Sequence, residues 1–119
     1  MRRVSHWIGG KSVTGESGRS GPVFDPARGV QTAVVDLASV EEMDSAIAVA
    51  QAAGEQWRSS SLSARAGILF RFRELLDAHR ADLAALVTAE HGKVLSDAMG
   101  EVARGVENVE FSCGIPHML

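Results

Sequence analysis

The chain has little that would support a disulfide, a membrane span or a nucleic-acid surface. It contains one cysteine among 119 residues, so it cannot form an internal disulfide, and this fits a reducing compartment. Its 12 basic residues are scattered among 15 acidic ones, which argues against nucleic-acid binding. No apolar run approaches bilayer length, and the stretch after the basic start is broken at His6, Gly9 and Gly10, so no signal peptide is expected. We therefore expect a cytoplasmic protein that binds neither nucleic acid nor membrane.

The first third of the chain has the pattern of short strands joined by turns. With 45% hydrophobic and 23% charged residues, the whole sequence is typical of a globular chain with one core. Residues 5–13 are expected to form two strands that turn at Gly9 and Gly10, and residues 25–29 a turn closed by Gly29. A further strand is expected from Val30 to Leu37. The strand-rich arm is therefore predicted to cover residues 1–38.

The remaining residues, 39–119, are predicted to be helical. Ser39 and Glu42 form an S-x-x-E capping box, and apolar residues then recur at helical spacing until about Arg58. A second helical stretch is expected to begin within 61–63, to bend within 79–81 and to stop at Gly92, where a left-handed residue can end a helix. A third helix is expected from Ser96 to about Cys113, with Val102, Val106 and Val109 on its inner face.

Two glycine patterns resemble phosphate-binding loops but lack the required context. Gly10-Lys11-Ser12 is not preceded at the correct spacing by a glycine, because Ser5 occupies that position, and no helix follows directly. Gly15, Gly18 and Gly21 are spaced G-x-x-G-x-x-G, whereas the dinucleotide fingerprint is G-x-G-x-x-G between a strand and a helix. We interpret both as turns and expect no cofactor-binding residue in this chain.

No metal or nucleophile site is predicted either. Cys113 and His117 are close in sequence, but a tetrahedral zinc site needs about four ligands, and the other histidines have no ligand spacing. A cysteine packed at a helix end is the favoured interpretation.

Arg104 is the one candidate binding residue. Ala103 precedes it and Gly105 follows it, so the flanks leave space beside the guanidinium. A planar guanidinium can donate two parallel hydrogen bonds to a carboxylate, which would make Arg104 a carboxylate clamp. An ordinary solvated helix arginine is the alternative, and spacing alone leaves both open. Lys93 and Glu101 receive no role, since the helix dipole explains a lysine at a helix C-terminus and a glutamate at a helix N-terminus.

Several segments of the chain resemble the aldehyde dehydrogenase superfamily, and the resemblance covers essentially its whole length. Within the superfamily, the resemblance is strongest to the methylmalonate-semialdehyde dehydrogenase subgroup. The subgroup signal is the third helix with Arg104 and the segment that follows it. The matching segments are Trp7-Ile8-Gly9-Gly10-Lys11, Asp25-Pro26-Ala27-Arg28-Gly29, residues 65–76, Glu90-His91-Gly92-Lys93, residues 100–111 and Cys113-Gly114-Ile115-Pro116-His117.

The resemblance implies an enzyme in which a cysteine thiolate attacks an aldehyde, hydride passes to NAD and the resulting thioester is transferred to CoA. For malonate or methylmalonate semialdehyde, loss of carbon dioxide accompanies this and yields acetyl-CoA or propionyl-CoA. The arginine that matches Arg104 grips the substrate carboxylate in that subgroup. Cys113 does not match the catalytic cysteine, so the chain alone is expected to be inactive, with no catalytic residue of its own.

The implied fold class is α/β. The chain would form the N-terminal part of an aldehyde dehydrogenase-like cofactor-binding domain, with short N-terminal strands followed by three to four helices. The complete enzyme is expected to be a homo-oligomer. One alternative of a different class is a stand-alone, non-catalytic module that self-associates or binds a partner through exposed helix faces.

Overall fold

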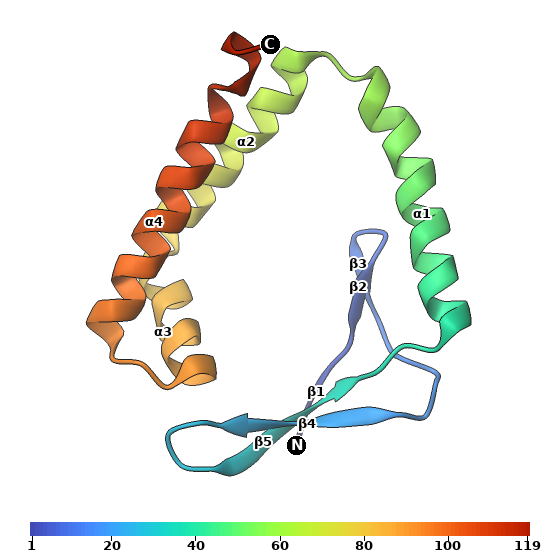
Figure 1. Cartoon of the computed structure of the whole chain (residues 1–119), viewed down its shortest axis with the longest axis vertical. Coiled ribbons are helices and arrows are strands. Elements are labelled where there is room, and N and C mark those ends of the chain that lie inside the picture. The colour runs from blue at the N-terminus through green and yellow to red at the C-terminus, as the bar shows by residue number, and fades with distance from the viewer. The chain divides into compact units, whose positions relative to one another are not determined.

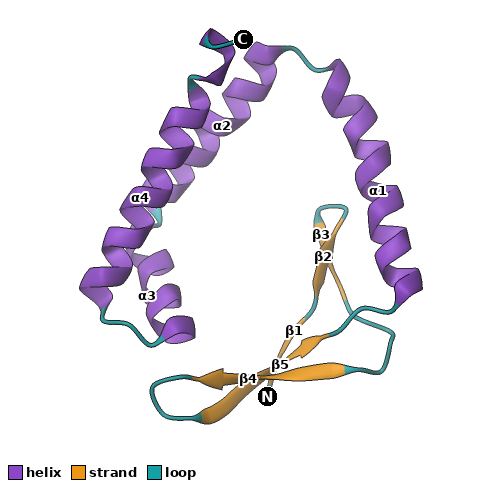
Figure 2. Ribbon diagram, viewed as in Figure 1, coloured by secondary structure: helices purple, strands orange, loops and turns teal.

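All 119 residues are described by a computed structural model, which divides into two compact units. The first unit, Met1–Ser59, contains every strand and the first helix, α1. The second, Ser60–Leu119, contains the other helices (Figures 1 and 2). The boundary between the two units therefore lies after α1, and not where the strands end and the helices begin.

The first unit is built on a three-stranded sheet with the order β1-β5-β4. β1 (Arg2–Val4) runs parallel to β5 (Val30–Asp36), and β4 (Ser20–Asp25) runs antiparallel to it, with a register shift between Val23 and Phe24. Ala33 and Asp36 of the central strand are the buried residues of this unit. Neither β1 nor β4 was predicted. The partner of β1 lies some thirty residues away in the sequence, and Gly21, interpreted as part of a turn, lies within β4.

A separate hairpin joins β2 (His6–Ile8) to β3 (Lys11–Val13). Its turn residues Gly9 and Gly10 have φ angles of 60° and 78°, in the left-handed region that favours glycine. The predicted hairpin is therefore confirmed, and Gly10-Lys11-Ser12 leads into a strand rather than into a phosphate-binding helix.

The capping box at Ser39 begins α1 (Val40–Ser59) as predicted. The Glu42 amide donates to Ser39 Oγ over 3.2 Å, and Glu42 Oε2 accepts from the Ser39 amide over 2.8 Å. These two bonds satisfy amides that the first turn of a helix leaves without partners. No side chain of α1 is fully buried, and Met43 and Ile47 on its apolar face are 57% and 50% exposed.

The second unit consists of α2 (Leu62–Ala78), α3 (Arg80–His91) and α4 (Leu95–Cys113), followed by a short 3-10 turn, η1 (Ile115–His117). Its helix boundaries follow local signals. Ser61 Oγ caps α2, the predicted bend at His79 separates α2 from α3, and Gly92 ends α3 with a φ of 85°.

α4 packs against both α2 and α3 (Figure 1). Val106 is 1% exposed, and Ala98 and Cys113 are also buried on the same helix, while Val102 and Val109 are half-buried. The predicted inner face of this helix is therefore confirmed. An ion pair supports the packing at the surface, because Arg73 of α2 donates from Nε and Nη2 to Glu110 Oε1 of α4 over 2.8 and 2.5 Å.

The predicted α/β class, with short N-terminal strands followed by helices, is confirmed by these elements. Many large apolar side chains nevertheless remain exposed, including Trp7 at 74%, Phe111 at 69% and Phe70 at 54%. None of the helices combines the length and the apolar character that crossing a bilayer would require.

Candidate functional site

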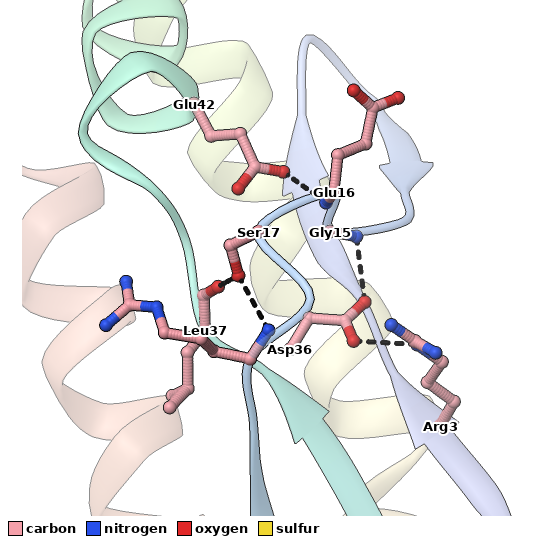
Figure 3. A network of polar contacts seen from close by, with 8 residues as sticks. Arg3, Gly15, Glu16, Ser17, Asp36, Leu37 and Glu42 are labelled. Atoms are coloured by element: carbon pink, nitrogen blue, oxygen red, sulfur yellow. Dashed lines mark hydrogen bonds and ion pairs between the residues drawn. The ribbon is translucent and has the colours of Figure 1, made fainter.

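The chain has two clusters of polar side chains that could form a site, and the first lies around the buried Asp36 at the end of β5 (Figure 3). The Asp36 side chain has no exposed surface, and its two oxygens have different partners. Oδ1 accepts from Arg3 Nε over 2.7 Å, and Oδ2 accepts from the Gly15 amide over 2.9 Å. Asp36 thereby ties β1 and the loop after β3 to the central strand.

Close by, Glu42 fastens the same loop to the start of α1 (Figure 3). Its Oε1 accepts from the Glu16 amide over 2.7 Å, in addition to the capping bond from the Ser39 amide. The Gly15 amide, together with the Arg3 guanidinium, holds the pKa of Asp36 below its usual value. The Ser39 and Glu16 amides likewise lower the pKa of Glu42. Because partners within the chain satisfy both carboxylates, we interpret this cluster as structural.

The second cluster surrounds Arg104, the predicted binding residue, on the outer side of α4. A hollow of about 340 Å³ lies here and is lined by six residues from the α3–α4 connection and the first turns of α4, namely Lys93, Ser96, Asp97, Gly100, Glu101 and Arg104. A side chain at Gly100 or at Gly105 would meet nothing within 4 Å. Arg104 is exposed, and its guanidinium makes no hydrogen bond or ion pair within the chain, although its charge acts on Glu101 through space. This group is therefore available to an external anion.

Lys93 and Glu101 form an ion pair within the same hollow. Lys93 Nζ donates to Glu101 Oε1, and the Lys93 side chain is only 19% exposed. The bond from Lys93 lowers the pKa of Glu101, and the positive charge of Arg104 acts in the same direction. The dipole argument from sequence overlooked this pairing, because the two residues are eight positions apart and meet only once Gly92 has turned the chain from α3 into α4.

The other sequence candidates do not assemble into a site. Cys113 is buried at the end of α4, as the packed-cysteine interpretation predicts. The loop that carries Gly15 and Gly18 leads into β4 rather than into a helix, so it lacks the geometry of a dinucleotide-binding turn. No group of three His, Cys, Asp or Glu side chains is placed to hold a metal ion.

Comparison with known proteins gives one consistent result. Residues 13–119 match the family profile described as "Aldehyde dehydrogenase family". The chain is 47% identical over 118 residues to malonate-semialdehyde dehydrogenase 3 of Geobacillus kaustophilus, covering 99% of this chain and 24% of that protein. Methylmalonate-semialdehyde dehydrogenase (DddC) of Oceanimonas doudoroffii superposes with a TM-score of 0.94 at 44% identity, covering 100% and 24% of the two chains.

A Sinorhizobium meliloti 1021 protein solved in complex with NAD is also similar. Its TM-score is 0.93 at 39% sequence identity, with coverage of 98% of this chain and 24% of the other. The chain thus spans about a quarter of the length of the relatives it matches.

Proposed function

Because this chain belongs to the aldehyde dehydrogenase family, we propose that it forms the amino-terminal part of a CoA-acylating dehydrogenase for malonate or methylmalonate semialdehyde. In the proposed reaction, malonate semialdehyde, NAD⁺ and CoA give acetyl-CoA, carbon dioxide and NADH, and methylmalonate semialdehyde gives propionyl-CoA. The observation that carries the proposal is the 39–47% identity to malonate-semialdehyde dehydrogenases over essentially the whole chain.

Arg104 is the residue of this chain that we propose touches the substrate. Its guanidinium makes no hydrogen bond or ion pair within the chain and borders a hollow. Both features are needed in a group that binds the carboxylate of a substrate. The planar guanidinium can donate two parallel, charge-assisted hydrogen bonds to the substrate carboxylate, which fixes the orientation of the substrate as well as binding it. The aldehyde carbon carries no charge, so the carboxylate is the feature by which such a site can select its substrate.

NAD and CoA have no assigned binding residues in this chain. The loop that carries Gly15 and Gly18 enters β4 rather than a helix, so it offers no helix N-terminus to a pyrophosphate. We expect NAD and CoA to bind to other parts of the complete enzyme, as the family resemblance implies. That the complete enzyme is a homo-oligomer remains a prediction from the family resemblance, and a cytoplasmic location remains a prediction from the composition and the start of the sequence.

The proposal is tested first by the intact mass of the protein purified from its source, followed by an activity assay. We expect a mass several times 12.6 kDa and CoA-dependent NADH formation from malonate semialdehyde, with acetyl-CoA as the product. A mass near 12.6 kDa would instead favour the non-catalytic module, which would use the exposed apolar faces for association. A full-length protein without this activity on either semialdehyde would refute the proposed reaction.

Replacing Arg104 tests the proposed carboxylate clamp. Arg104→Ala is expected to cost about 1.5–3 kcal/mol of carboxylate binding, or about a 10- to 150-fold loss in kcat/KM on malonate semialdehyde. Propanal, which has no carboxylate, should be affected much less. Arg71→Ala is the matched control, because Arg71 is an exposed helix arginine of the same unit outside the hollow. Equal losses on both aldehydes would exclude the clamp.

A further inference from the structure

The ion pair between Lys93 and Glu101 bears directly on Arg104. Glu101 precedes Arg104 by three residues on α4, a spacing at which a glutamate and an arginine on a helix surface ordinarily pair. The structure has no ion pair between these two side chains; Lys93 Nζ donates to Glu101 Oε1 and compensates the charge of the carboxylate. The result is a hollow in which Lys93 is bonded to Glu101, whereas the Arg104 guanidinium acts on that carboxylate only through space and makes no hydrogen bond to it.

The placement of Lys93 explains why it prevails in this competition. It sits in the three-residue connection between α3 and α4, where Gly92 is left-handed with a φ of 85° and Val94 is extended. Its side chain is 19% exposed and is thereby restrained beside Glu101, whereas Arg104 is exposed. A restrained cation loses less conformational entropy on pairing than a mobile one, so the carboxylate is held by Lys93.

We propose that Lys93 is a positioning residue for substrate selection, which occupies the Glu101 carboxylate and so leaves the Arg104 guanidinium to the carboxylate of the substrate. This inference rests on the proposed function, since it requires Arg104 to bind a substrate carboxylate. Lys93 itself does not touch the substrate. Without it, Glu101 would act as an internal competitor that the substrate must displace.

The inference is tested in the full-length dehydrogenase with three variants, Lys93→Met, Lys93→Arg and the double variant Lys93→Met/Glu101→Gln. We expect Lys93→Met to raise the KM for malonate semialdehyde about two- to fivefold, the range of a surface ion pair that must be broken. The kcat, and the KM for propanal, should remain unchanged. Lys93→Arg should retain the low KM, and Glu101→Gln should restore it in the Lys93→Met background by removing the competitor.

Lys11→Met is the matched control, because Lys11 is the only other lysine of the chain, is exposed and lies in the first unit. It removes the same charge and should leave both KM values unchanged. If the double variant is as impaired as Lys93→Met, Lys93 acts through its own charge and the inference is wrong. A joint change of kcat and of both KM values would show a merely structural role and would also overturn it.

Arg104→Ala separates this inference from the proposed function. If Arg104→Ala leaves the KM for malonate semialdehyde unchanged, the clamp itself fails. If Arg104→Ala raises that KM while Lys93→Met does not, the clamp stands and only the role of Lys93 is refuted.

Discussion

Among the glycines of the chain, Gly15 has the least room for a side chain, and this predicts a large effect for Gly15→Ala. A Cβ at Gly15 would lie 2.8 Å from Asp36 Cβ and 3.1 Å from His6 Nε2, so the surrounding groups must move. The φ of Gly15 is outside the left-handed region, so space rather than backbone conformation is the obstacle. Inserting a methyl into a packed site costs about 1–3 kcal/mol, and the lower entropy of the unfolded alanine chain offsets about 0.4–1 kcal/mol of this.

Gly15→Ala is therefore expected to lower the free energy of unfolding by about 1–2 kcal/mol, as measured by urea unfolding of the purified protein. Gly21→Ala is the matched control in β4, because its Cβ would meet Val35 Cγ1 at an ordinary 3.5 Å. That variant should be neutral or slightly stabilising, by up to about 1 kcal/mol. Equal stability of the two alanine variants would refute the reasoning from steric contact.

Two further predictions concern the same unit. Ser39→Ala removes the side-chain acceptor of the capping box and is expected to destabilise the protein by about 1 kcal/mol in urea unfolding, whereas Ser39→Asp should retain most of the stability. The second follows from the lowered pKa values of Asp36 and Glu42, whose usual values are 3.8 and 4.5. Because the folded carboxylates bind protons less readily than the unfolded ones, their stabilisation is complete above about pH 5 and is lost as the pH falls through the lowered values. The melting temperature should therefore decrease as the pH falls below about 4, and this decrease should be less steep in Asp36→Asn. Identical pH profiles of the unmodified protein and Asp36→Asn would contradict a stabilising role for the Asp36 carboxylate.

The candidate site could be predicted only in part from the sequence. Arg104 stands out because small residues flank it and because its helix carries the family resemblance, and the structure leaves its guanidinium free. The pairing of Lys93 with Glu101 could not be predicted. It depends on the turn at Gly92, which sets the direction of α4 relative to the end of α3, and no periodic pattern encodes a contact across such a turn.

Local sequence signals are sufficient to specify the individual elements. Glycines at 9, 10 and 92 supply positive φ angles, Ser39 and Glu42 start a helix, and helical periodicity places Val106 inward, since each signal acts within a few residues. Contacts between distant segments emerge only in the folded chain: β1 pairs with β5, Arg3 and Gly15 bind the two oxygens of Asp36, and Arg73 binds Glu110. Such contacts join residues some twenty to forty positions apart, and their energies depend on burial and on competing partners, which local patterns do not specify.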